Sequence, residues 1–133
     1  MKKSDLDKWI AQYKKSWEQL DTELFLTLFS DDASYQSSPF QMPARGSELR
    51  QMWDGLKTRQ SGNHIELEVW RLEGDTAIVH WKGSSTIKDM GPRDGDGVFI
   101  LRFAKGGRCR HLHEWQHWHP AAAPPTKGFS ENP

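Results

Sequence analysis

The spacing of apolar residues changes near residue 62, and this change constrains the fold more than any other feature of the chain. Between residues 4 and 20 one apolar stripe runs at helical spacing. The stripe consists of Leu6, Trp9, Ile10, Tyr13, Trp17 and Leu20. From residue 63 onward apolar and polar residues alternate, as in Ile65, Leu67 and Val69, which is typical of strands. Helices that precede a run of strands indicate an α+β domain.

The first two helices have predicted starting signals. Ser4 followed by Asp7 is a capping-box arrangement, so the helix over 4–20 is expected to begin at Ser4. Asp21 is expected to cap a shorter helix over 22–29.

The end of the second helix and the third helix are predicted from the next segment. Asp31 and Asp32 are expected to end the second helix, and residues 33–38 form a short strand before Pro39. A third helix is expected over 47–60, closed by a glycine at 62.

Four longer antiparallel strands are predicted over 63–72, 76–87, 98–104 and 108–118. Residues 88–97 are rich in Gly, Pro and Asp and are expected to form a polar loop. A twisted sheet curled around a helix leaves a cone with a cavity at its open end.

Length and composition fit one domain. The 133 residues predict a single domain over 1–120 and a flexible C-terminal tail over 121–133. Apolar residues make up 35% of the chain, but seven Trp, six Phe and two Tyr can still close a core. Each buried aromatic side chain removes about 150–250 Å² from water.

Charge and cysteine content narrow the class of protein. Lys+Arg and Asp+Glu balance at 18 each, so nothing indicates a nucleic-acid partner. No apolar run approaches the length of a membrane span, and the N-terminus lacks the features of a signal peptide. The single cysteine, Cys109, excludes an internal disulfide. We expect a cytoplasmic protein without a membrane or nucleic-acid partner.

Several segments together resemble the nuclear transport factor 2-like superfamily, in particular its SnoaL-like, polyketide-cyclase-like group. They are "LFLTLFSDDASYQSSPF", "PARG" leading into "SELRQMW", "GDTAIVHWKG", "GVFILRF" and "GGRCRHLHEWQHWHP". The resemblance runs from about residue 6 to residue 120. It implies a cone-shaped barrel, in which a curved antiparallel or mixed sheet wraps the N-terminal helices as in a ketosteroid-isomerase-like or cystatin-like roll. It also implies a pocket and a homodimer formed through the outer face of the sheet.

Glu114 is the leading catalytic candidate. It shares one strand parity with Leu112 and Trp118, and if that parity faces the cavity, Glu114 is the carboxylate of this strand that points inward. Burial among apolar groups would raise its pKa and suit it to acid–base chemistry. The resemblance supports this role, since several catalytic members carry an acid at a comparable place. The alternative is a structural ion pair between Glu114 and Arg102.

Tyr13 and His80 are the predicted acid–base partners of Glu114. Ketosteroid isomerases of the superfamily use a helix tyrosine as an oxyanion donor, and Tyr13 lies on the first helix. Their general base is an aspartate before a proline, where this chain has Ser37-Ser38-Pro39, so the ketosteroid isomerase mechanism is in doubt. The alternative, which we prefer, is that Tyr13 is a core residue whose hydroxyl reaches the cavity.

The opposite parity of the last strand raises the question of a metal site. It carries His111, His113, His117 and His119. The pair His111 and His113 could bind one ion, with His80 or Glu66 as a third ligand. The alternative, which we prefer, is a half-exposed sheet surface, so neither a metal nor a cofactor is predicted.

The predicted ligand is a small apolar molecule held mainly by aromatic side chains. The residues expected to line the pocket are Trp17, Tyr35, Phe40, Trp53, Trp81, Phe99, Leu112 and Trp118. Three functions remain open: an isomerase, cyclase or hydrolase that works by acid–base chemistry, a non-catalytic ligand-binding homodimer, and a metal-dependent protein. Fold alone does not choose among them.

Overall fold

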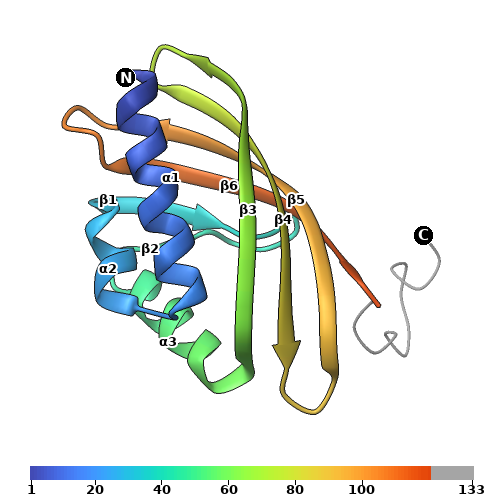
Figure 1. Ribbon diagram of the computed structural model, residues 1–133. Coiled ribbons are helices and arrows are strands. Elements are labelled where there is room, and N and C mark those ends of the chain that lie inside the picture. Colours follow the sequence, from blue (N-terminus) through green and yellow to red (C-terminus); the bar gives the residue numbers. More distant parts are fainter. Residues whose placement is uncertain (121–133) are drawn as a thin grey trace.

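Residues 1–120, the part of the chain that the computed structural model describes, form three helices and six strands (Figure 1). The helices lie on one face of a single sheet that curls around them. The predicted tail over 121–133 lies outside the described residues. The elements are α1 (Lys3–Glu18), α2 (Thr22–Thr27), β1 (Phe29–Gln36), β2 (Ala44–Arg45), α3 (Glu48–Arg59), β3 (Gln60–Glu73), β4 (Thr76–Ile87), β5 (Gly91–Phe103) and β6 (Cys109–His119).

The sheet is mixed and open. Its strand order is β2-β1-β6-β5-β4-β3, in which β1 runs parallel to β6 and every other neighbouring pair is antiparallel. The curved sheet and the helices that it wraps confirm the expected α+β cone, although the strands do not close into a complete barrel. None of the helices in the described residues is long and apolar enough to cross a membrane.

The helix boundaries follow the predictions in part. Asp21 caps α2 as expected, since its carboxylate accepts a hydrogen bond from the backbone N–H of Leu24 at 3.0 Å. The capping box at Ser4 was wrong: α1 begins one residue earlier, after Lys2, and no side chain caps it. Tertiary packing of the apolar stripe stabilises α1 without that cap.

Three strands, β1, β3 and β5, are longer than predicted because sheet pairing overrides local sequence signals. Asp31 and Asp32 do not end a helix but belong to β1. Gly62 does not close α3 but lies inside β3 with φ of 63°, where the pairing with β4 shifts register. The expected loop over 88–97 is mostly strand, since β5 begins at Gly91.

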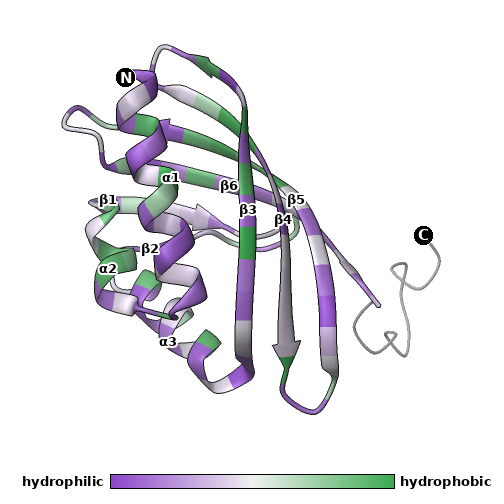
Figure 2. Cartoon of the chain, viewed as in Figure 1, coloured by the Kyte–Doolittle hydropathy of each residue, from purple (hydrophilic) through white to green (hydrophobic). Residues whose placement is uncertain are grey.

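The core is aromatic and lies between the helices and the concave face of the sheet. The stripe of α1 buries Leu6, Trp9, Tyr13 and Trp17, and Figure 2 shows green apolar segments alternating with purple ones along α1. Farther in, the rings of Phe25 and Trp53 stack with centroids 3.7 Å apart. Trp53 of this stacked pair also lines a pocket.

Candidate active site

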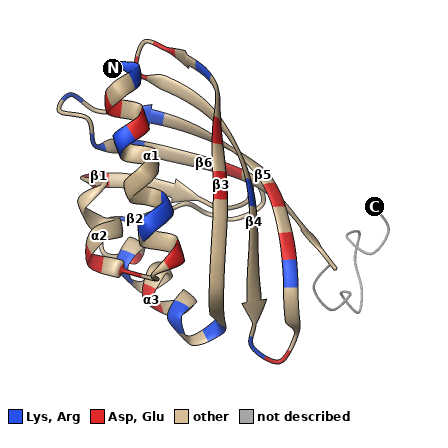
Figure 3. Ribbon diagram, viewed as in Figure 1, with Lys and Arg blue, Asp and Glu red and all other residues tan. Residues whose placement is uncertain are grey.

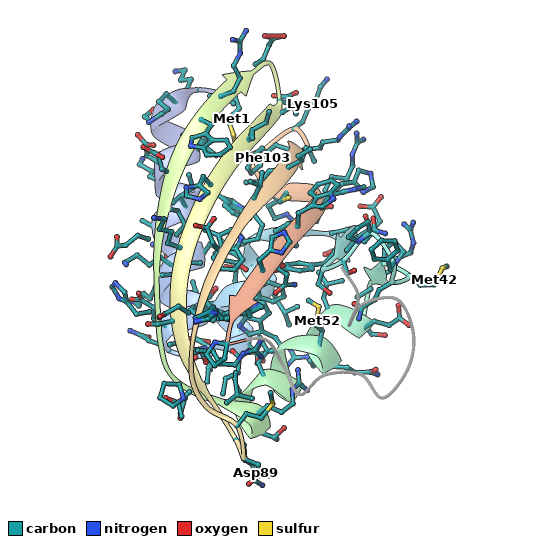
Figure 4. All side chains as sticks on the ribbon, turned by 90° about the vertical axis from the view of Figure 1, so that its right-hand side faces the viewer. Met1, Met42, Met52, Asp89, Phe103 and Lys105 are labelled. Atoms are coloured by element: carbon teal, nitrogen blue, oxygen red, sulfur yellow. The ribbon has the colours of Figure 1, made fainter. Side chains whose placement is uncertain are left out.

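A pocket of about 250 Å³ lies between α1, α3 and the concave face of the sheet. Met52 of α3, which is labelled in Figure 4, is one of its walls. The lining residues are Tyr13, Trp17, Tyr35, Ser37, Met52, Trp53, Leu56, Arg59, Gln60, Ile65, Trp81, Phe99, Glu114, Gln116 and Trp118. Most are apolar or aromatic, and a few polar groups converge among them, which is the usual composition of a small-molecule site.

The inward-facing parity of β6 is the one that carries Glu114. Leu112 and Glu114 are buried, whereas Trp115 between Glu114 and Gln116 is exposed. Glu114 pairs with Phe99 of β5, and both line the pocket. The register of this pairing therefore places a carboxyl group beneath the aromatic wall.

Glu114 is buried without a cationic partner. Its relative exposure is 8%, and it forms no ion pair within residues 1–120. Arg102, the alternative partner, instead pairs with His111 in the sheet register and is exposed. Burial raises the pKa of Glu114 to about 8, although the nearby Tyr35 hydroxyl and Trp81 indole oppose the shift. The carboxyl group is therefore mainly uncharged at neutral pH.

Two tyrosines connect to Glu114 in a buried chain of hydrogen bonds. The Tyr35 hydroxyl donates to Oε1 of Glu114 at 3.5 Å, and the hydroxyl oxygens of Tyr13 and Tyr35 are 2.9 Å apart. Each hydroxyl has one proton, so when Tyr35 donates to Glu114, Tyr13 donates to Tyr35. Burial, followed by the nearby Glu114 carboxylate, raises the pKa of both tyrosines well above the usual value. Both remain donors at neutral pH.

Trp81 provides an unused donor beside the same carboxyl group. Its indole nitrogen is buried, lines the pocket and has no hydrogen-bond partner of ordinary geometry within residues 1–120. It nevertheless lies near enough to Glu114 to favour the ionised form of that carboxyl group, and this opposes part of the rise in pKa that burial causes. An unsatisfied buried N–H is costly, so a site that keeps one is suited to an acceptor formed or bound there.

Two glycines of β5 make room for the tryptophans of the pocket. Gly97 pairs with Trp81 and Gly95 pairs with Trp118. A Cβ at Gly97 would lie 2.6 Å from the Trp81 ring, and one at Gly95 would lie 2.8 Å from the Trp118 ring. Both indoles can therefore lie across the strand, where any larger residue would displace them.

Most of the predicted lining residues do line the pocket, namely Trp17, Tyr35, Trp53, Trp81, Phe99 and Trp118. Two do not. Leu112 is fully buried in the core below the pocket, and Phe40 is 84% exposed on the loop after β1.

His80 is not brought to Glu114. It lies on the outer face of the sheet, where its Nε2 is 2.7 Å from Asp96 and its ring stacks on Trp70 with centroids 4.8 Å apart. The strand parity explains this: on β4 the buried side chains are those of Val79 and Trp81, so the residue between them points outward. Tyr13 and Tyr35, rather than His80, are the polar neighbours of Glu114.

The histidine pair does not gather a metal-binding set. Within residues 1–120 no group of three or more His, Cys, Asp or Glu side chains could hold an ion. Nδ1 of His111 is 2.6 Å from the Ser34 hydroxyl, and burial lowers the pKa of this imidazole. The third ligand that a His111 and His113 site would need is missing from the described part of the chain.

Sequence reasoning identified Trp53 on the α3 side of the pocket but missed the other α3 residues that line it. Met52, Leu56 and Arg59 line it at helical spacing, and Gln60 follows at the start of β3. The signal was present, because Arg59 continues the stripe of Met52 and Leu56 by three residues.

The fold and this pocket define a class of protein, the ketosteroid-isomerase-like and nuclear transport factor 2-like α+β cones. More specifically, residues 10–112 match the SnoaL-like domain, and the chain belongs to that family. The family includes isomerases and cyclases and binds small ligands. No functionally curated protein matches the chain.

Solved structures with the same fold are distant in sequence. SalBIII, an epoxide hydrolase/cyclase-like enzyme with a role in pyran ring formation in the polyether salinomycin, has a TM-score of 0.73 at 13% identity, over 84% of this chain and 89% of SalBIII. A ketosteroid isomerase-like protein from Catenulispora acidiphila, in complex with trimethylamine, has a TM-score of 0.71 at 15% identity, over 80% and 83%. A conserved protein from Planctomyces limnophilus has a TM-score of 0.69 at 13% identity, over 85% and 94%. At these identities the likeness shows the fold alone.

Proposed function

We propose that this protein is a small-molecule enzyme of the isomerase, cyclase or hydrolase kind, with Glu114 as its general acid. The observation that carries the proposal is a buried carboxyl group that lines an aromatic pocket, has its pKa raised to about 8 by burial, and forms no ion pair within residues 1–120. A carboxyl group with a pKa near the working pH is efficient at proton transfer, which contributes about 10²–10⁴-fold to rate.

The proton transfer has a defined course. Glu114 donates its proton to an oxygen of the substrate, such as a carbonyl or an epoxide oxygen, and becomes a carboxylate. The Tyr35 hydroxyl and the Trp81 N–H, both beside it, stabilise that charge. The carboxylate then regains a proton from a substrate carbon or from water, which restores the acid.

Isomerisation, cyclisation and hydrolysis share this first step. The lining residues include one carboxylic acid, Glu114, and where a ketosteroid isomerase places its basic aspartate this chain has Ser37, which also lines the pocket. One group must therefore serve as acid and then as base. The relationship to SalBIII, a protein described as epoxide hydrolase/cyclase-like, supports an epoxide or a similar oxygen as the group that Glu114 protonates.

The alternative is a pocket that binds a ligand without chemistry. The same aromatic wall would bind such a ligand, and the two proposals differ in what Glu114 does.

We also propose a homodimer formed through the outer face of the sheet, where Trp70 is 56% exposed and Trp115 is 42% exposed. The expected cytoplasmic location rests on the sequence and stays a prediction.

The test uses NMR on protein labelled with ¹³C at glutamate carboxyl groups. We expect one carboxyl group to titrate near pH 8, and its signal to be absent from Glu114→Gln.

A second experiment measures turnover of a panel of small cyclic epoxides and enones by NMR. Glu114→Gln should lower this turnover by about 100-fold or more. Glu68→Gln, on the outer face, is the matched control and should keep full turnover. Titration of Glu114 near 4.5 would contradict the proposal, and turnover that persists in Glu114→Gln would favour binding without acid catalysis.

A further inference from the structure

A cationic residue lines the mouth of the pocket. Arg59 lies in the last turn of α3, where blue segments mark the basic end of the helix in Figure 3. Its guanidinium folds back over Gly55, since a Cβ built there would lie 3.2 Å from Nη1. Lys57 on the same helix is ion-paired with Asp54 at 3.7 Å, whereas the Arg59 guanidinium makes no ion pair or hydrogen bond within residues 1–120.

The charge of the pocket is therefore unbalanced. Among the lining residues of the described chain, Arg59 carries the one permanent charge. Glu114, the acid in the same lining, is mainly neutral at pH 7 because burial raises its pKa to about 8. An aromatic pocket with a net positive charge at its mouth attracts an anion more strongly than a neutral molecule of the same shape.

We propose that the pocket takes a small aromatic or alicyclic carboxylate, with its ring among the tryptophans and its carboxylate on Arg59. The planar guanidinium fork matches a carboxylate in bidentate geometry. The inference rests on the proposed function, because that function assigns Glu114 to an oxygen at the buried end of the same ligand.

The size of the pocket limits the ligand. A volume of about 250 Å³ lies just below the roughly 300–1,000 Å³ of pockets that take drug-sized ligands. That space favours a ligand of one or two rings. A carboxylate at the exposed mouth also keeps part of its hydration, which makes binding of the charged group less costly than it would be beside Glu114.

The experiment compares trans-cinnamate with trans-cinnamamide, a pair that differs in charge but little in shape, by isothermal titration calorimetry at pH 7. We expect cinnamate to bind about tenfold more tightly, in line with a partly exposed charge-assisted hydrogen bond. Arg59→Gln should remove this preference and leave the affinity for cinnamamide unchanged. Lys57→Gln, which removes one positive charge from the same helix outside the pocket, should retain the preference. Circular dichroism melting curves identify any variant that fails to fold.

Three outcomes would overturn the inference: equal affinity for acid and amide, a preference that survives in Arg59→Gln, or no binding of cinnamate at millimolar concentration. Glu114→Gln separates this inference from the proposed function. If it keeps the preference for cinnamate while turnover of the epoxide and enone panel is lost, both stand. If the preference is lost in Glu114→Gln and kept in Arg59→Gln, Glu114 and not Arg59 holds the carboxylate, and the inference fails alone.

Discussion

At the scale of single residues, Glu114 shows how burial sets chemical behaviour. A carboxyl group on a strand surface would be ionised at neutral pH, but this one lies under Tyr35 and Trp81 with 8% of its surface exposed. Its pKa is raised to about 8 by burial because two neutral donors do not replace the lost hydration of a carboxylate. The residue is thus held as an acid by the fold itself.

The first prediction concerns stability against pH. The Glu114 pKa is raised from 4.5 to about 8 on folding. Its contribution is therefore present below about pH 4.5 and is lost as pH rises toward 8, because the unfolded chain ionises first. The loss is on the order of 4 kcal/mol in the free energy of unfolding. Urea unfolding at pH 5 and pH 8 should show Glu114→Gln gaining stability relative to the parent protein by several kcal/mol across this interval. A constant difference between the two proteins would contradict a raised pKa.

The second prediction concerns the tyrosine chain. Tyr35→Phe removes the hydroxyl that donates to Glu114 and leaves Tyr13 without its acceptor at 2.9 Å. Losing a donor to the carboxylate should raise the Glu114 pKa further and slow turnover by about tenfold, the effect of one hydrogen bond of roughly 1.4 kcal/mol. The ¹³C titration and the turnover assay check both effects. Tyr13→Phe is the matched control, since it removes the outer hydroxyl and should change the pKa less.

At the scale of elements, β5 is a strand whose first half could not be predicted from local sequence patterns. Its first seven residues, "GPRDGDG", have the composition of a loop, yet Gly91 to Gly97 pair with β4 throughout. A glycine-rich composition predicts turns because glycine is flexible. Here the glycines have another role, because the Trp81 and Trp118 rings lie against strand positions that have no room for a side chain. The contacts that select a strand here lie 16 residues or more along the chain, outside any local window.

Other elements were predictable because their signals are local. The helical stripe that contains Tyr13 and Trp17, the Asp21 cap and the parity of β6 each depend on neighbours a few residues away. The parity argument identified Glu114 as the inward acid. It could not place His80 outside the pocket, because the face of a central strand with apolar residues on both sides is decided by the whole sheet.

The third prediction tests β5. Gly97→Ala would set a methyl group 2.6 Å from the Trp81 ring and against the backbone oxygen of Trp115. We expect a loss of about 1–3 kcal/mol in the free energy of unfolding, as for other overpacked sites, and a displaced Trp81. Gly55→Ala on α3 is the control: its methyl group would meet only the flexible Arg59 side chain, so the helix should gain up to about 1 kcal/mol. Urea midpoints check both, and an unchanged midpoint for Gly97→Ala would contradict the packing argument.

At the scale of the whole molecule, the two faces of the sheet differ in what covers them. The concave face holds the core and the pocket, while the outer face carries Trp70 and Trp115 in contact with solvent. His80 stacks under Trp70 and pairs with Asp96, so the exposed tryptophan lies among polar side chains that already have partners. Exposed tryptophans on an ordered sheet face are typical of a surface that another protein covers.

The final prediction is that two copies of the chain cover this face. Native mass spectrometry at ten micromolar or so should then give the mass of a dimer. Trp115→Glu places a carboxylate in the interface, and an unpaired buried charge costs several kcal/mol, enough to shift the protein to monomer. The folded monomer should survive the change, because Trp115 is 42% exposed in the single chain. Met42→Glu is the control, since Met42 is 90% exposed and projects from the loop after β1, away from the body of the molecule (Figure 4). A monomeric parent protein, or a Trp115→Glu variant that stays dimeric, would show that the outer face does not form the interface.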